Sequence, residues 1–288
     1  MQLFEPYNAT RRQMDAPGRT HVKMLTDEAL GRALSAAGLS PHAAVVKRLD
    51  PAAGPSIAVD ADRYFYPASM LKTPLAAAAL HLVAAGELAL EQSFEVTQGC
   101  MTSNDAESPF QTGFRGRLSL IIERAITHSD NVATNMLYDI CGRERATAIA
   151  RDTFGLADTA FYRKLSGSEP LIVDPLWDGT HRNRHSARDA ARMFELIATD
   201  GVAYASLLRE TLARQTFNNK LNAGLLPSDR FAHKTGDTDE VTHDGGIITL
   251  AGGARYVIVV YTGLESTDEH NARFAEFMKS ARAGLAGG

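Results

Sequence analysis

The chain has 288 residues, of which 44% are hydrophobic and 22% are charged, and its formal net charge is −4. This length and composition exclude a disordered or fibrous protein, and they fit one large globular domain or two lobes that share a cleft. The acidic balance and the lack of any dense Lys/Arg run argue against a broad basic surface. We therefore expect no nucleic-acid partner.

The cysteines indicate neither a disulfide framework nor a metal site. Cys100 and Cys141 form no CxxC pair and no Cys/His cluster at metal-ligand spacing, so we expect two buried free thiols, no metal and no cofactor. The first residues lack the apolar core of a secretion signal, and the apolar run at 75–85 is too short for a bilayer. As written, the sequence predicts a cytoplasmic protein without a membrane partner, or a periplasmic or secreted one if a leader has been trimmed.

The amino-terminal part predicts an arm, a helix and two strands. Residues 1–25 are polar and show no apolar periodicity, which predicts an arm before the fold. From Thr26, a typical N-cap, the apolar spacing predicts a helix that stops at Gly38. Short apolar stretches at 43–49 and 56–59, separated by a Pro/Gly-containing turn, predict a strand hairpin.

The middle of the chain predicts mainly helices, and the end returns to strands. Helical patterns cover 69–85, 117–127, 131–141, 143–154, 186–198 and 203–214. An irregular interval at 161–185 interrupts them, and since loops of this length tend to be functional, we expect it at the cleft. Residues 243–246 are expected to end a hairpin turn and start a strand. Strand patterns cover 230–235, 246–250 and 255–262, and a last helix is predicted at 268–283.

This order of elements predicts an α/β (α+β) fold. Strands from both ends of the chain would build one sheet lobe, and an all-helical lobe would be inserted between them. We assign residues 26–66 and 215–288 to the α/β lobe and residues 67–214 to the helical lobe, after the arm at 1–25.

Ser69 and Lys72 form the first of three motifs that can carry chemistry. If a helix begins at Ser69, residues three apart share a face, so the Lys72 amine can reach the Ser69 hydroxyl. A lysine can act as a base when it is neutral, and an N–H at the positive end of a helix can stabilise an oxyanion. Alone, this pair is common by chance, because Ser is a frequent N-cap and Lys a frequent helix residue.

The second motif is Ser-Asp-Asn, with Ser129 and Asn131 between two predicted helices. In a site, the serine hydroxyl would relay a proton to a departing amide nitrogen, and the asparagine would hold the amide group of the substrate. Taken alone, all three residues are ordinary capping residues.

The third motif is Lys234-Thr235-Gly236, at the end of a predicted strand. The lysine and threonine can bind a substrate carboxylate, the glycine permits a close approach, and the N–H of Asp237 would give a second oxyanion donor. An edge-strand lysine before a glycine turn is the alternative for such a motif taken alone.

Together the three motifs occur in the order typical of class A β-lactamases and penicillin-binding proteins. Ser129 follows Ser69 by 60 residues, and Lys234 follows Ser129 by 105. Over about residues 26–283 the chain resembles a class A β-lactamase or a close serine-hydrolase relative. The resemblance implies an antiparallel sheet flanked by helices, joined to an all-helical lobe, with the site between them.

The resemblance also implies a role for each motif residue. Ser69 would be acylated, and Lys72 would shuttle its proton. Ser129 and Lys234 would serve the leaving group and the substrate carboxylate. The residues expected to bind and orient the substrate are Asn131, Thr235, Gly236 and Asp237.

The loop at 161–185 departs from the resemblance. The Glu-x-x-Leu-Asn segment with which class A enzymes hydrolyse the acyl-enzyme is absent, and Leu165 falls near the expected glutamate. Glu169 is the nearest candidate base, although a solvated loop residue is an equal alternative. Arg163 is matched to the arginine that pins this loop in the family, with Asp174 or Asp178 as its partner.

Asp237 departs as well, because a small uncharged residue is usual there. Its carboxylate would repel an anionic substrate unless the side chain points away.

The leading function is a serine hydrolase that opens a β-lactam or a related cyclic amide through an ester on Ser69. A D-Ala-D-Ala peptidase or an esterase with the same machinery, and a sensor that captures a β-lactam covalently, are the alternatives. The expected partner is a small-molecule amide or ester.

Overall fold

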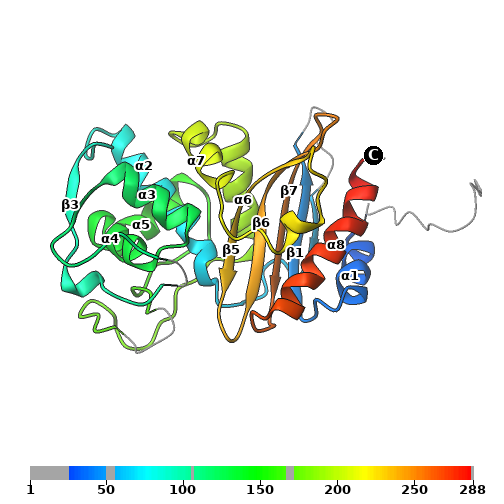
Figure 1. Cartoon of the computed structure of the whole chain (residues 1–288), viewed down its shortest axis with the longest axis horizontal. Helices are drawn as coiled ribbons and strands as arrows, with labels where there is room; N and C mark the ends of the chain where they lie inside the picture. Colours follow the sequence, from blue (N-terminus) through cyan, green and yellow to red (C-terminus); the bar gives the residue numbers. More distant parts are fainter. Residues whose placement is uncertain (1–25, 50–55, 105–106, 167–171, 287–288) are drawn as a thin grey trace, which may run out of the picture.

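The structure, a computed structural model, describes residues 26–49, 56–104, 107–166 and 172–286. The predicted arm at 1–25 and Glu169 lie outside the described residues. The main element is a five-stranded sheet with the strand order β2-β1-β7-β6-β5, in which every neighbouring pair is antiparallel (Figure 1). Its strands are β1 (His42–Arg48), β2 (Ile57–Val59), β5 (Arg230–Asp237), β6 (Thr242–Thr249) and β7 (Arg255–Thr262).

The helices come mostly from the middle of the chain. They are α1 (Asp27–Ala36), α2 (Lys72–Ala84), α3 (Leu118–Thr127), α4 (Asn131–Cys141), α5 (Arg143–Ala148), α6 (Ala187–Ala198), α7 (Ala205–Leu212) and α8 (Asp268–Ala286). Short helical turns are η1 (Ala68–Leu71), η2 (Gln98–Cys100), η3 (Ile149–Thr153) and η4 (Leu221–Gly224). A two-stranded sheet that the sequence did not predict joins β3 (Ser93–Glu95) to β4 (Arg115–Arg117).

Side-chain caps fix where several helices begin. Thr26 Oγ1 accepts a hydrogen bond from Ala29 N at 3.2 Å, at the start of α1. Asp130 Oδ1 accepts from Ala133 N at 2.9 Å, at the start of α4. Because an N-cap oxygen satisfies a backbone N–H that has no intrahelical acceptor, these residues set the helix boundaries.

The two faces of the sheet are covered by different helices. Ile258 and Val260 of β7 pack in one core with α1 and α8, whereas Val257 and Val259 pack in a second core with α2, α4 and α6. This split follows from the alternation of side chains along a strand, and a strand buried on both faces reads as a continuous apolar run. Figure 1 shows α1 and α8 at one end of the molecule and α2 to α5 at the other, with β5 the strand of the five-stranded sheet nearest to these helices.

The structure confirms the predicted fold class and corrects one strand. Residues 243–246 lie inside β6, and not at the end of a turn as expected. Gly246 is needed there for packing, because a Cβ on it would lie 2.2 Å from the carbonyl oxygen of Ala232. The glycine pair therefore marks a close approach between strands. The division into lobes at 67–214 stays a prediction, and α6, which lies within that range, packs on the sheet.

Candidate functional site

Ser69 lies on the short 3₁₀ turn η1, which leads directly into α2. The expected α-helix beginning at Ser69 therefore begins three residues later, at Lys72. The backbone N–H of Lys72 donates to the Ser69 carbonyl oxygen. In a 3₁₀ turn the side chains at i and i+3 lie on the same side, so we expect Lys72 to lie on the same side of the turn as Ser69. Ala68, just before the serine, has φ +47°, which is uncommon for a residue with a Cβ.

Two strands hold the turn that carries Ser69. A Cβ on Gly236 of β5 would lie 3.0 Å from the Pro67 carbonyl oxygen and 3.3 Å from the Ala68 Cβ, so a side chain there would push the turn away from β5 by a few tenths of an ångström. His243 of β6 places Nε2 2.8 Å from the Tyr66 carbonyl oxygen. The predicted site residue Gly236 thus contacts the turn, and His243, which the sequence analysis gave no role in the site, anchors the segment before it.

The Ser129 hydroxyl lies between two buried lysine amines. Lys72 Nζ is 3.2 Å from Ser129 Oγ, and Lys234 Nζ is 3.0 Å from the same oxygen. Both lysine side chains are fully buried, whereas Ser129 is partly exposed. Ser129 has φ +53°, a conformation that costs a non-glycine residue on the order of 1–3 kcal/mol. The fold therefore holds Ser129 in an unfavourable backbone conformation, in which its hydroxyl lies next to the lysines of the other two motifs.

Asn131 connects the second motif to the first. Its Oδ1 accepts a hydrogen bond from Lys72 Nζ at 2.7 Å, and its Nδ2 donates to the Ser103 carbonyl oxygen at 3.0 Å. The backbone N–H of Asn131 donates to Asn104 Oδ1 at 2.5 Å. Lys72 also donates to the Ser129 carbonyl oxygen. These acceptors fix the position of the Lys72 amine.

The backbone N–H of Asp237 points away from β6, toward the outer edge of the sheet. The hairpin between β5 and β6 closes with a hydrogen bond from Thr238 N to the Val241 carbonyl oxygen at 2.9 Å. Because bonded and non-bonded pairs alternate along an antiparallel ladder, the neighbouring Asp237 N–H points away from β6. β5 is the last strand of its sheet, and its Gly236 packs on η1. The Asp237 N–H therefore lies at the edge that faces the Ser69 turn.

The Asp237 side chain is held by a buried lysine. Asp237 Oδ1 accepts hydrogen bonds from Lys220 Nζ at 2.5 Å, Ser266 Oγ at 2.6 Å and Thr242 Oγ1 at 2.9 Å. Burial opposes ionisation of this carboxyl, but the charge and hydrogen bond of Lys220 outweigh it and keep the pKa of Asp237 below its ordinary value. Lys220 lies in an irregular segment, and no sequence pattern pointed to it.

A different arginine from the expected one pins the loop at 161–185. Arg143 of α5 forms a buried ion pair with Asp174, and its Nη1 donates to the Tyr162 carbonyl oxygen at 2.9 Å. Arg163, the predicted partner, instead stacks on the Trp177 ring with 4.6 Å between its guanidinium carbon and the ring centroid. The sequence prediction was wrong because such pairs depend on which elements the fold brings together.

Asp178, the other aspartate suggested for Arg163, pairs with His181 at 2.5 Å, and this pairing lowers the pKa of Asp178 to about 2. Leu165 is buried, so the loop places an apolar side chain near the position where the resemblance predicts a base.

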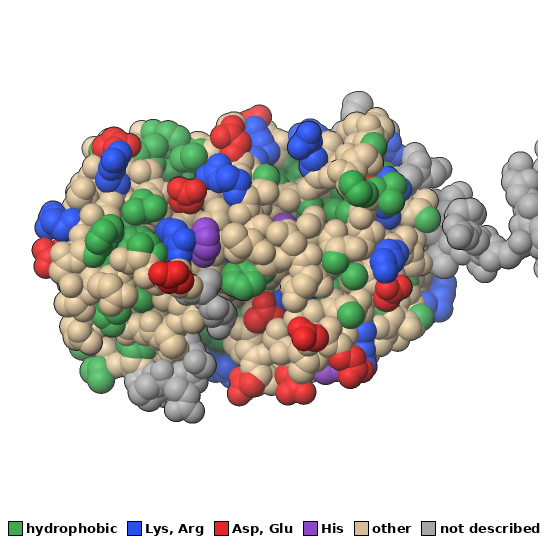
Figure 2. Space-filling view, in the orientation of Figure 1, with side chains coloured by type: hydrophobic (Ala, Val, Ile, Leu, Met, Phe, Trp, Pro, Cys, Tyr) green, Lys and Arg blue, Asp and Glu red, His purple; other side chains and the backbone are tan. Residues whose placement is uncertain are grey.

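Cys100 and Cys141 are buried and free, which confirms the prediction for the thiols, and burial raises the pKa of Cys141 to about 12. Within the described ranges, no three His, Cys, Asp or Glu side chains gather where they could hold a metal ion. Among the helices that the structure describes, none is both long and apolar enough to cross a membrane. On the face shown in Figure 2, basic and acidic side chains are interspersed.

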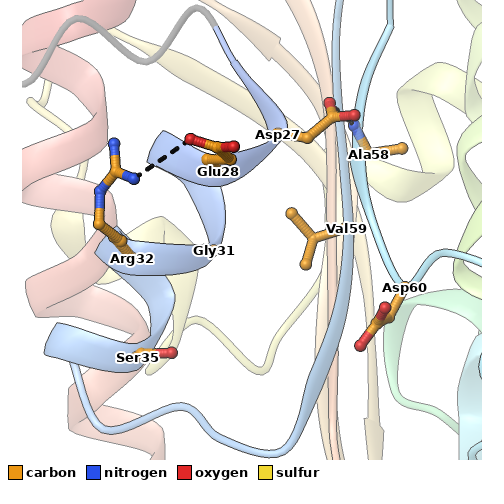
Figure 3. Close-up of a pocket in the computed structure, with 8 residues that line it drawn as sticks. All are labelled: Asp27, Glu28, Gly31, Arg32, Ser35, Ala58, Val59 and Asp60. Carbon is orange, nitrogen blue, oxygen red and sulfur yellow. Dashed lines mark hydrogen bonds and ion pairs between the residues drawn. The ribbon is translucent and has the colours of Figure 1, made fainter.

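An open groove of about 640 Å³ lies away from these residues, between α1 and the edge strand β2 (Figure 3). Its acidic side chain Asp27 already has a structural partner, because Oδ1 accepts from Ala58 N at 2.8 Å. Arg32 in the same groove pairs with Glu28 at 3.6 Å. We assign no site to this groove.

Comparisons with known proteins point to the same family as the three motifs. The model of the β-lactamase enzyme family matches residues 29–280. The extended-spectrum β-lactamase PER-1 of Pseudomonas aeruginosa is 25% identical over 227 residues, which cover 74% of this chain and 73% of PER-1. An ancestral class A β-lactamase is 26% identical with a TM-score of 0.74, over 89% of this chain and 98% of that one. A leucine-to-glutamate variant of PBP-A, solved as an acyl-enzyme complex with penicillin G, shares the fold with a TM-score of 0.76 at 23% identity, over 88% and 94%.

Proposed function

The chain belongs to the β-lactamase enzyme family and is a class A β-lactamase-like serine hydrolase, and from this premise we propose that Ser69 opens β-lactams or related cyclic amides by forming an acyl-enzyme. The observation that carries the proposal is the Ser129 hydroxyl, which lies within hydrogen-bond reach of both Lys72 Nζ and Lys234 Nζ. Such a contact between amine and hydroxyl is the arrangement that proton transfer needs.

In the proposed acylation, the Ser69 oxygen attacks the amide carbonyl while neutral Lys72 takes the hydroxyl proton. The backbone N–H groups of Ser69 and Asp237 are proposed to stabilise the oxyanion, because the Asp237 N–H lies at the edge of β5 that faces the Ser69 turn. Ser129 then gives its proton to the departing amide nitrogen and receives one from Lys72. Lys234 supports this relay through its contact with Ser129 Oγ.

The substrate side of the site is proposed to be Asn131, Thr235, Gly236 and the Asp237 N–H. Thr235 is buried at the end of β5, next to Lys234. A lysine and a threonine at this position can donate hydrogen bonds to a polar group of the substrate, while Asn131 Oδ1 holds Lys72 in the orientation that the proton transfer requires.

Slow deacylation is the second part of the proposal. Hydrolysis of the acyl-enzyme needs a base that activates a water, and the buried Leu165 supplies none. Glu169 stays a candidate base. Leu165 also favours the alternatives in which the acyl-enzyme persists, namely a D-Ala-D-Ala peptidase or esterase that acts poorly on β-lactams, or a covalent β-lactam sensor. PBP-A, which shares the fold of this chain, has been solved as a leucine-to-glutamate variant in an acyl-enzyme complex with penicillin G.

The test is to incubate the purified protein with a penicillin and with a cephalosporin, to follow its intact mass with time, and to map any adduct by peptide digestion. A transient adduct on Ser69 with accumulating hydrolysed product indicates a β-lactamase, and a persistent adduct favours a peptidase or a sensor. If no adduct forms, and Ser69→Ala protein behaves in the same way, the proposed β-lactam chemistry is wrong.

A further inference from the structure

The two carboxylate oxygens of Asp237 have different surroundings. All three hydrogen bonds from Lys220, Ser266 and Thr242 go to Oδ1. Among the residues that the structure describes, no hydrogen bond to Oδ2 is found. The Asp237 side chain is 30% exposed, whereas the Lys220 side chain is 1% exposed. The pair therefore has its cation inside the protein, while the side chain that carries the negative charge is partly exposed.

The carboxylate is charged at neutral pH, since Lys220 holds the pKa of Asp237 below its ordinary value. Lys220 is also fixed from behind, because its Nζ donates to the His243 carbonyl oxygen at 3.0 Å and lies 5.8 Å from the centroid of the Phe274 ring. It cannot turn toward a substrate without leaving these contacts. The end of the pair that a substrate meets is thus negative.

Thr235 and Asp237 occupy the same face of β5, because side chains two residues apart in a strand point to the same side. A substrate whose carbonyl oxygen lies at the Asp237 N–H therefore places a neighbouring substituent close to both side chains. If this substituent is a carboxylate, it meets the like charge of Asp237, which costs binding free energy. A neutral group avoids that cost, and an ammonium group gains an ion pair.

We propose that Asp237, held by Lys220, makes this site select substrates whose substituent beside Thr235 is neutral or cationic rather than anionic. The substrate class is then an ester, an amide or an ammonium-bearing analogue of a β-lactam acid. This inference rests on the proposed acylation of Ser69, and it assigns to Asp237 a role in specificity besides the oxyanion contact of its backbone.

The experiment compares three probes that differ only at the ring carboxyl group: penicillin G, its methyl ester and its 2-aminoethyl ester. Rates of Ser69 adduct formation are measured by mass for the unchanged protein and for Asp237→Asn, which keeps the shape of the side chain. We expect the two esters to acylate the unchanged protein about tenfold faster than the acid, and the ratio of acid to ester rates to rise about tenfold in Asp237→Asn. High salt should narrow the difference in the unchanged protein.

Two further variants serve as controls for this interpretation. Asp237→Ser removes the charge in a second way and should shift the ratio in the same direction. Asp229→Asn is the matched control, since Asp229 pairs with Arg282 at 2.5 Å beside the other end of β5, and it should leave the ratio unchanged. If the ratio of acid to ester rates is the same in both Asp237 variants as in the unchanged protein, this inference is wrong, while the proposed function still stands. If none of the probes acylates Ser69, the proposed function fails and this inference fails with it.

Discussion

Asn135 holds Leu165 by both of its backbone polar groups. Asn135 Nδ2 donates to the Leu165 carbonyl oxygen at 2.9 Å, and Asn135 Oδ1 accepts from Leu165 N at 2.8 Å. Asn135 is fully buried on α4, one turn after Asn131, so the same helix positions Lys72 and fixes the loop. The backbone at position 165 is therefore held in a fixed position relative to the site, and so is the origin of any side chain placed there.

Leu165→Glu should shorten the life of the acyl-enzyme. A carboxylate at this position supplies the base that the loop lacks, and general base catalysis typically contributes about 10²–10⁴-fold. We expect hydrolysis of the penicillin adduct on Ser69 to accelerate by at least about tenfold, measured by the decay of the adduct mass after excess penicillin is removed. Leu165→Gln has a similar size without the charge and should hydrolyse the adduct as slowly as the unchanged protein. Equal lifetimes for both variants would contradict this role for position 165.

Glu169 is the competing candidate for the base in the unchanged protein. If it activates the hydrolytic water, Glu169→Gln should slow the decay of the adduct by about 10²-fold or more, because the amide cannot accept a proton. The same measurement of adduct mass applies. A lifetime that does not change removes Glu169 from the mechanism and leaves the buried Leu165 as the reason for slow turnover.

Ser129→Ala should slow acylation of Ser69 and leave the fold intact. The change removes the oxygen that both lysine amines contact, and with it the proposed path of the proton to the leaving nitrogen. We expect the rate of adduct formation to fall by about 10²–10³-fold in single-turnover mass measurements. Ser206→Ala, on the exposed side of α7, is the matched control. Acylation at the original rate in Ser129→Ala would exclude the relay.

Elements whose boundaries are set by local chemistry could be predicted from the sequence. The predicted bounds of α4 agree with the structure at both ends, because Asp130 caps its start and Gly142, with φ +73°, ends it. The bounds of β7 also agree, since its β-branched run is buried on both faces. The residues of the three motifs, whose order and spacing the sequence shows, meet in the structure around Ser129.

Features that depend on contacts between distant segments could not be predicted. Gly245 and Gly246 suggested a turn, but they serve the close packing of β6 against its neighbours. The partner of Asp174 is Arg143 and not Arg163, because α5 and the loop meet only in the folded chain. Lys220 lacks any motif, and its role appears only once it meets Asp237 across the fold.

The buried Arg143–Asp174 pair should matter for stability far more than an exposed pair. Asp174 also accepts a hydrogen bond from Lys164 N at 2.8 Å through Oδ2, so it ties two parts of the loop to α5. Removing one partner of a buried pair leaves an uncompensated charge and costs about 3–5 kcal/mol. We expect Arg143→Met to lower the melting temperature by on the order of 10 °C in thermal unfolding.

The exposed pair of Arg117 and Glu91, at 2.7 Å, gives the comparison. Arg117→Met should cost no more than about 1 kcal/mol, because solvent screens this pair. If the two variants melt within a degree or two of each other, the Arg143–Asp174 pair does not pin the loop as argued.

His243 should make the protein less stable as the solution becomes acidic. Burial lowers the pKa of His243 from 6.5 to about 4, and its neutral ring places Nε2 near the Tyr66 carbonyl oxygen and accepts from Thr262 N at 3.1 Å through Nδ1. As the pH falls below about 6.5, the unfolded chain binds a proton at this residue while the folded chain does not. The free energy of unfolding therefore falls between pH 6.5 and about 4, by on the order of 3 kcal/mol for this residue. The buried His185, whose pKa burial lowers to about 3, acts with the same sign.

Urea unfolding at about pH 7 and at about pH 5 measures this effect, because the carboxylates with lowered pKa values titrate below that window. The stability of the unchanged protein should fall between the two values, and in His243→Gln the fall should be about 2 kcal/mol smaller, since glutamine does not titrate. Should the two proteins lose the same free energy over this interval, His243 is not the titrating group.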